Sequence, residues 1–296
     1  MTRSAFIAII GKPNVGKSSL LNSVLGEKIA IVTDKPQTTR TRITGVLTKG
    51  ETQLVFIDTP GFHKPKTKLS NKMNNAVTTS ITDVDALIFV VEATSRLTEP
   101  ELNLIKSIKE SKLPCVLVIN KIDLAPNKQI VMNKINELSA MHEFNAVVPV
   151  SVLQNDSVDL VLKEIEKFAQ ESVHYFPDDT LTDQPERVIV SEIIREKILL
   201  NLYQEIPHGT AVVIEKMKER EGKNILDIEA YIYCEKNSHK GMIIGKGGAV
   251  LKRIASTARE DIESFLDVKI NLQCWVKVKE DWRNRDNLIK NFGLSD

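Results

Sequence analysis

Short apolar runs alternate with stretches of helical periodicity over the first 170 residues of the chain. Stretches such as 102–110 and 158–168 repeat apolar residues at helical spacing, whereas the runs between them have the length of strands. This alternation predicts a mostly parallel sheet covered by helices, the architecture of an α/β domain. Only residues 49–53 separate the second run from the third, which predicts one antiparallel strand at the sheet edge. The runs span 6–10, 43–48, 54–57, 86–91, 115–119 and 146–150.

The pattern changes after residue 173. Residues 174–187 are rich in proline and acidic side chains, which predicts a linker. The remaining chain has the order α-β-β-α-α-β if residues 237–244 form a short helix. We therefore expect a domain over 1–173, a linker over 174–187, and an α+β domain with a C-terminal tail over 188–296. The expected helices of the second domain are 188–203, 237–244 and 249–265, and its expected strands are 211–217, 225–233 and 268–278.

The composition is that of a folded protein with little net charge. Apolar residues make up 42% and charged residues 27% of the 296, which excludes wholesale disorder. The 40 Lys and Arg residues balance 39 Asp and Glu residues, so a uniformly polybasic protein is excluded, whereas local patches are not. We expect neither a signal peptide nor a membrane-spanning helix. The widely spaced Cys115, Cys234 and Cys274 predict buried free thiols in a reducing cytosol, and therefore a cytoplasmic location.

Residues 11–18, GKPNVGKS, form the first candidate site. They match GxxxxGK[ST] and stand between a strand-like run and a helical stretch, the setting in which such a loop surrounds phosphate. Backbone N–H groups and the helix N-terminus would bind phosphate oxygens, Lys17 would add charge at the β- and γ-phosphates, and Ser18 would ligate Mg²⁺. The expected nucleotide-binding residues here are Gly11, Lys12, Asn14, Val15, Gly16, Lys17, Ser18 and Ser19.

Two further motifs follow strand-like runs. In DTPG, Asp58 ends a strand and would hold the magnesium shell, and Gly61 would offer its N–H to the γ-phosphate. In NKID, Asp123 would accept hydrogen bonds from the N1–H and the N2 amino group of guanine. Adenine lacks both donors and would leave that carboxylate unpaired, so the motif favours guanine. Asn120 would steady the neighbouring loops, and the stem of Lys121 would cover the base.

The second domain carries a different phosphate-binding signature. Residues 242–248, MIIGKGG, place a GxxG loop directly before a helical stretch, as in KH domains, where such a loop clamps about four nucleotides of single-stranded RNA. Residues 236–259 contain six basic residues and no acidic one, which indicates one nucleic-acid-binding face. The element order matches the type II KH arrangement. The expected RNA-binding residues are Ile243, Ile244, Gly245, Lys246, Gly247, Gly248, Lys252 and Arg253.

The three motifs between residues 11 and 123 together resemble the translation-factor-like GTPases of the P-loop class. The resemblance implies GTP and GDP as ligands, Mg²⁺ as cofactor and hydrolysis of GTP to GDP and phosphate. The fifth element of that family corresponds to Ser151 and Val152. This sequence departs from the family pattern at Val152, but a backbone N–H there would still contact guanine O6.

The resemblance also assigns residues 32–42, VTDKPQTTRTR, as the first switch. It implies that Thr39 ligates Mg²⁺ when the γ-phosphate is present, with Thr38 as the second choice. Asn14 resembles the position that ligates K⁺ in some relatives with a TTR motif, which makes K⁺ a candidate cofactor. The catalytic residues that follow from motif and resemblance are Asn14, Lys17, Thr39 and Gly61.

Ras-like enzymes orient the attacking water with a glutamine just after DxxG. Here Phe62 and His63 follow Gly61. The apolar ring of Phe62 cannot position water by hydrogen bonding, and His63 is a weak candidate for that role. We therefore expect slow hydrolysis or help from another group.

The whole chain resembles the family of bacterial Era-type GTPases. GKPNVGKSSLLN and QTTRTR carry the resemblance in the first domain, and SEIIREK, IIGKGG and LQCWVKVKEDW carry it in the second. The family implies a GTPase domain followed by a type II KH domain, and a monomer that binds the 3′ region of 16S ribosomal RNA during assembly of the 30S subunit. It further implies a link between assembly and growth or the cell cycle, and peripheral association with the cytoplasmic side of the membrane.

One alternative has the second domain dock a protein or a membrane surface instead of RNA. The helical stretch 188–203 is amphipathic, but its polar face mixes acidic and basic residues, which favours packing in a domain core over a lipid anchor. Of the two tryptophans, Trp275 is expected in the core, and Trp282 is the candidate for stacking on RNA.

Overall fold

The computed structural model describes residues 1–35, 37–62, 67–203 and 206–294. The chain forms two compact units. The first contains Met1–Lys66 and Ser70–Asp183, and the second contains Thr67–Leu69 and Gln184–Asp296.

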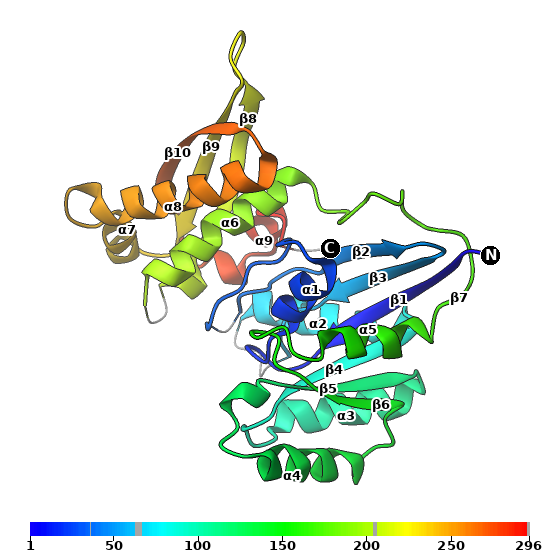
Figure 1. The fold of residues 1–296 in the computed structure, drawn as a ribbon. Helices are drawn as coiled ribbons and strands as arrows, with labels where there is room; N and C mark the ends of the chain where they lie inside the picture. The colour runs from blue at the N-terminus through cyan, green and yellow to red at the C-terminus, as the bar shows by residue number, and fades with distance from the viewer. Residues whose placement is uncertain (36, 63–66, 204–205, 295–296) are drawn as a thin grey trace. The chain divides into compact units, whose positions relative to one another are not determined.

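The first unit is built on a sheet with the strand order β2-β3-β1-β4-β5-β6 (Figure 1). Neighbouring strands from β3 to β6 run parallel, whereas β2 pairs antiparallel with β3, and the short β7 pairs antiparallel with β1. The mostly parallel sheet with an antiparallel edge strand is therefore confirmed. The strands are β1 (Arg3–Ile10), β2 (Ile43–Lys49), β3 (Thr52–Asp58), β4 (Ala86–Glu92), β5 (Cys115–Asn120), β6 (Ala146–Pro149) and β7 (Gln170–Glu171).

Helices cover both faces of this sheet, which explains its continuous apolar runs. In β1, Ile7 and Ile9 pack into one core and Ala8 and Ile10 into the other. Because the strands are parallel, the loops after β1, β3 and β5 open at one edge, where the phosphate-binding and base-binding motifs lie. The helices are α1 (Lys17–Leu25) and α5 (Val158–Glu166) on one face, and α2 (Lys68–Thr82), α3 (Glu99–Ser111) and α4 (Lys128–Ser139) on the other.

Much of the segment expected to be a linker lies along the edge strand β2. The Val46 N–H donates to the Leu181 carbonyl at 2.8 Å, and the Thr182 hydroxyl donates to the Thr44 carbonyl at 2.6 Å. Farther along, the side chain of Gln53 bonds the backbone of residues 175 and 176. These bonds satisfy a sheet edge that would otherwise expose unpaired backbone groups.

The second unit packs helices on one face of a small sheet with the order β10-β9-β8 (Figure 1). Strand β9 pairs antiparallel with β8 and parallel with β10. The α-β-β-α-α-β order is confirmed, including its short middle helix. The elements are α6 (Glu186–Asn201), β8 (Ala211–Glu219), β9 (Ile225–Cys234), α7 (Asn237–Ile244), α8 (Ala249–Leu266), β10 (Lys269–Val278) and α9 (Asp286–Asn291).

The expectation for the two tryptophans was wrong. Trp282 is fully buried, and its indole N–H donates to the Gly209 carbonyl at 2.9 Å. Trp275 is 39% exposed. In β10, Cys274 and Val276 face the helices, so alternation along the strand turns Trp275 to the opposite face.

The cysteines are free thiols, as predicted. Cys115 and Cys234 are buried, whereas Cys274 is half-buried. Burial raises the pKa of each thiol, that of Cys274 to about 12, which keeps all three protonated at neutral pH.

Candidate functional site

The loop between β1 and α1 carries the predicted phosphate site. Gly16 has φ +100°, and a Cβ there would lie 2.2 Å from the Asn120 side-chain nitrogen, so only glycine fits. Lys17 begins α1, and its buried ammonium donates to the carbonyls of Gly11 and Lys12 at 3.2 and 3.0 Å. The loop thus holds a lysine against backbone groups at a helix N-terminus, an arrangement that suits phosphate.

Three predicted side chains meet beside this loop. The Ser18 hydroxyl donates to Asp58 Oδ2 at 2.6 Å and lies 2.8 Å from the Thr39 hydroxyl, which is 3.4 Å from the same carboxylate oxygen. The other carboxylate oxygen of Asp58 is buried and has no hydrogen-bond partner among the residues that the structure describes. A hard divalent cation prefers such an oxygen cluster, so these residues fit Mg²⁺. Thr38 instead bonds Thr33 and the Lys35 carbonyl.

Burial sets the charge balance of this region. It raises the pKa of the Asp58 carboxyl, an effect that the nearby Lys17 ammonium opposes. It also lowers the pKa of Lys17 to about 8, against the attraction of Asp58. A bound cation would stabilise the charged carboxylate, and a bound phosphate the charged ammonium, so the site is electrostatically suited to both.

Asn120 connects the phosphate loop to the predicted base-binding loops. Its side chain donates to the Val15 carbonyl at 2.8 Å and accepts from the backbone N–H groups of Lys121 and Val152 at 2.7 and 3.1 Å. Asn120 thus engages the Val152 N–H that was expected to contact guanine O6. Leu153 lines the same cavity and is mostly exposed.

Asp123 is held in place by the fifth motif. The hydroxyl of the buried Ser151 donates to Asp123 Oδ1 at 2.6 Å. This bond leaves the other carboxylate oxygen to accept from a base. Ser151 therefore orients the residue that is expected to distinguish guanine.

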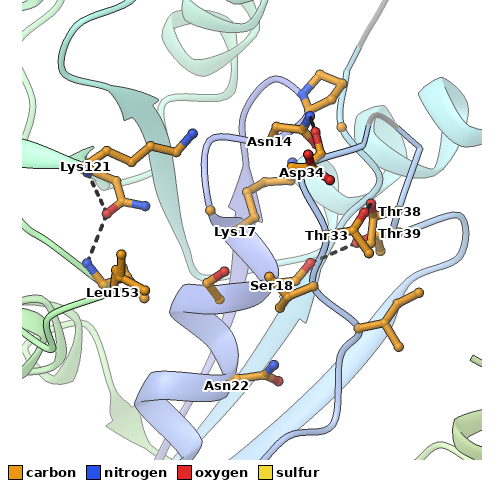
Figure 2. A pocket seen from close by; sticks show the side chains of 18 of the residues that line it. Asn14, Lys17, Ser18, Asn22, Thr33, Asp34, Thr38, Thr39, Lys121 and Leu153 are labelled. Atoms are coloured by element: carbon orange, nitrogen blue, oxygen red, sulfur yellow. Dashed lines mark hydrogen bonds between the residues drawn. The ribbon is translucent and has the colours of Figure 1, made fainter. Parts of the chain in front are cut away.

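Most of these groups line one cavity of about 730 Å³, the size of a small-ligand site. The predicted residues that do not line it are Gly11, Lys12, Val15, Asp58 and Ser151. The phosphate loop, the first switch and the base-binding loops all contribute to its wall (Figure 2). Its lining residues include Asn14, Gly16, Lys17, Ser18, Ser19, Thr38, Thr39, Gly61, Asn120, Lys121, Asp123, Val152 and Leu153.

The sequence motifs did not predict two acidic residues that form ion pairs with lysines of the nucleotide-binding motifs. Lys12 turns to the loop after β4, where its ammonium donates to Ser95 at 2.7 Å and lies 3.5 Å from the fully buried Glu101. Lys121 forms an ion pair of 3.3 Å with Glu92, at the end of the same strand. The capping box TEPE at the start of α3 is visible in the sequence, but its contact with the phosphate loop is not.

The first switch and the loop that follows β3 both contact the phosphate loop. Asn14 has φ +65°, and its side-chain amide donates to the Asp34 carbonyl in the first switch. The Phe62 N–H donates to the Gly11 carbonyl at 3.2 Å, and a Cβ on Gly61 would lie 2.6 Å from Pro13. His63 lies outside the described residues.

In the second unit, the GxxG loop joins α7 to α8. Gly247 and Gly248 have φ of +59° and +79°, and a Cβ on either would meet no atom within 4 Å. Gly248 precedes the first residue of α8 without a side-chain cap, so the amide groups of that helix end face an open surface. Lys246, Lys252 and Arg253 are exposed beside it.

Ile243 requires a correction. It was expected to contact RNA, but it is fully buried in the core between the helices and the sheet. Ile243 lies on the inner face of α7 and packs in the core, where it helps to hold the helix that precedes the GxxG loop. Ile244 is half-buried and retains some surface.

Comparison with known proteins identifies the family. A model described as 50S ribosome-binding GTPase matches residues 6–121, and a KH domain model matches residues 205–283. The GTPase Era of Ruminiclostridium cellulolyticum is 51% identical over 98% of this chain and 97% of its own length. The chain belongs to the Era family of GTPases. The GTPase Era of Clostridioides difficile (strain 630) is 50% identical over the full length of both chains.

Solved Era structures share the fold of the whole chain. A tyrosine-to-alanine variant of Aquifex aeolicus Era bound to GDP·AlF4⁻ has a TM-score of 0.96 and 36% identity, with both chains fully covered. Era in complex with MgGDPNP and nucleotides 1506–1542 of 16S ribosomal RNA gives the same three values. An N-terminal P-loop GTPase domain followed by a KH domain, the fold class predicted from the sequence, is therefore confirmed.

As an Era-family GTPase, the chain binds and hydrolyses GTP. Phosphoryl transfer depends on positioning and on charge stabilisation around the γ-phosphate. Lys17 and the backbone of the phosphate loop can supply part of that charge. The described part of the chain shows no glutamine beside Gly61, so the water-orienting group of Ras-like enzymes is replaced or absent.

Proposed function

We propose that this Era-family GTPase is a nucleotide-controlled switch that binds the 3′ region of 16S ribosomal RNA and assists assembly of the 30S subunit. The proposal is carried by the full-length likeness to an Era structure that holds both MgGDPNP and a segment of that RNA. The GxxG loop and its exposed basic residues supply matching chemistry.

In the nucleotide site, Ser18, Thr39 and Asp58 would hold Mg²⁺, which neutralises phosphate charge when it is bound. Lys17 and Gly61 would bind the β- and γ-phosphates through an ammonium and an N–H group. Gly11, Lys12, Val15, Gly16 and Ser19 would contribute mainly backbone positions around the phosphates. Asp123 would select guanine, with Asn120, Lys121, Ser151 and Val152 arranging the surrounding loops.

We further propose that K⁺ accelerates hydrolysis next to Asn14. The contact of its side chain with the Asp34 carbonyl brings two oxygen-bearing groups together at the phosphate loop. Hydrolysis should be at least about 10-fold faster in KCl than in NaCl, because a correctly placed charge stabilises the transition state. Asn14→Ala should remove this difference. Equal rates in the two salts at one ionic strength would contradict the proposal.

The switch model predicts that nucleotide state changes RNA affinity. A single-stranded RNA copied from the 3′ end of 16S ribosomal RNA should bind about 10-fold more tightly with a non-hydrolysable GTP analogue than with GDP, within the usual range of coupling. By linkage, the RNA should strengthen binding of the analogue by the same factor. Fluorescence anisotropy with a scrambled RNA as control measures both. Identical affinities in the two states would refute the coupling.

The proposal also includes a cellular location and a cellular role, both of which rest on resemblance to the Era family. The protein would be a cytoplasmic monomer that associates peripherally with the membrane, and it would link assembly to growth or the cell cycle. Within the described residues, no helix combines the length and apolarity needed to cross a bilayer. The apolar face of α6 packs in the core of the second unit, which argues against its use as a lipid anchor. Vesicle flotation with the full chain would test membrane association.

A further inference from the structure

The sheet of the second unit has a second face, turned away from α6, α7 and α8. Strand register arranges the side chains of this outer face in rows. One row contains Tyr233 and Lys277, and the next contains Val213, Tyr231 and Trp275. This face therefore concentrates three aromatic residues near one end of the sheet.

The C-terminal segment packs on the first of these rows at Tyr233, whereas Lys277 in the same row is exposed. Phe292 stacks on Tyr233 with ring centroids 4.6 Å apart, and Tyr233 is buried. The next row stays accessible: the rings of Tyr231 and Trp275 lie 5.5 Å apart at 34°, and Trp275 is 39% exposed. We call Tyr231, Trp275 and Lys277 the aromatic ledge.

The ledge also carries positive charge. The Lys277 ammonium lies 3.4 Å from the centroid of the Tyr231 ring, and among the described residues it forms no ion pair. Exposed Lys279 directly follows the last residue of β10. A cation beside exposed aromatic rings is suited to a ligand that combines flat bases with anionic phosphates.

Acidic residues of the outer face are largely neutralised by neighbours. Glu229 pairs with Lys216 at 3.4 Å, and Asp227 pairs with Arg220 and accepts from Asn271. Glu215 lies in the bulge of β8, at the opposite edge from β10. An anionic chain would therefore approach the ledge at Lys277, on β10.

We propose that the aromatic ledge is a second RNA contact, where a base of single-stranded RNA stacks on Trp275 and Lys277 meets a phosphate. This inference rests on the RNA binding of the proposed function. The GxxG loop belongs to the helical side of the sheet, so an RNA that reaches both surfaces must pass around its edge. The ledge would then add affinity only for RNA longer than the four or so nucleotides that the loop clamps.

The test compares two RNAs on the full chain with a non-hydrolysable GTP analogue. One is a short single strand that fills the GxxG loop, and the other is the whole 1506–1542 segment of the known Era complex. Trp275→Ala should weaken binding of the long RNA by about 5- to 100-fold, the usual effect of losing one stacked base, and leave the short RNA unchanged. Trp275→Phe should retain most of the affinity. Phe265→Ala, which removes another exposed aromatic ring in the same unit, should have no effect.

Tryptophan fluorescence gives an independent readout. Long RNA should quench the emission of the wild type, and the quenching should disappear in Trp275→Phe although binding persists, because Trp282 is fully buried. If neither RNA binds the wild type, the proposed function itself fails. If both RNAs bind, and Trp275→Ala binds the long one as tightly as the wild type does, the ledge proposal is overturned and a protein partner becomes the alternative.

Discussion

Asp123→Asn should change the preferred nucleotide from GTP to xanthosine triphosphate. Ser151 holds one carboxylate oxygen of Asp123 at 2.6 Å, and the other oxygen is the acceptor for the base. Guanine offers two donors there, whereas xanthine has a carbonyl at C2 to which the new amide can donate. GTP affinity should fall by at least about 100-fold, because guanine donors that are desolvated in the complex would lose their charged acceptor.

Competition between the two nucleotides, measured with a fluorescent GDP analogue, would quantify this change. Asp179→Asn makes the same substitution at an exposed site in the same unit and should bind GTP normally. Ser151→Ala should weaken GTP binding less than Asp123→Asn does, because the carboxylate would keep its charge and lose only its orientation. An unchanged preference in Asp123→Asn would remove Asp123 from base recognition.

The sequence predicted the sheet and the positions of its loops because both depend on local patterns. Apolar runs of strand length recur at β1, β4 and β5, and each motif directly follows a strand. The ends of parallel strands meet at one edge, so this order alone brings Gly16, Asp58 and Asn120 into one neighbourhood. The short helix α7, on which the expected α-β-β-α-α-β order depended, is present.

Contacts between distant segments could not be predicted in this way. Glu101 is distant in sequence from Lys12, and no local pattern relates a helix capping box to the phosphate loop. The bonds of residues 181 and 182 to β2 depend on an edge that only the assembled sheet reveals.

Orientation within an element was the other source of error. Ile243 and Ile244 are adjacent, and a helix turns only one of them fully into the core. The burial of the two tryptophans is the reverse of what was expected. Trp275 is exposed because alternation along β10 turns it away from the helices, whereas Trp282 is buried because the C-terminal segment packs around it. Bulk and apolarity predict burial on average, but they do not specify which face a residue takes.

The loss of RNA binding in Gly247→Asp should be the largest effect of any single substitution in the second unit. Gly247 has φ +59°, a conformation that aspartate adopts at modest cost, and a Cβ would meet no atom within 4 Å. The fold should therefore tolerate the change. The new carboxylate would stand at the open N-terminal end of α8, where it would occupy the place of a phosphate and repel the RNA backbone.

Gly222→Asp provides a closely matched control. Gly222 has φ +71° in the turn between β8 and β9, and a Cβ there would also meet no atom within 4 Å. Both variants add one negative charge and one side chain in the left-handed region, so their melting temperatures should agree closely. RNA affinity should fall by about 100-fold or more in Gly247→Asp, as expected when several phosphate contacts are lost, and stay near the wild-type value in Gly222→Asp.

GTP hydrolysis without RNA should be unchanged in both, because neither glycine belongs to the unit that holds the nucleotide. Equal RNA affinities in the two variants would mean that the GxxG loop does not bind the RNA backbone.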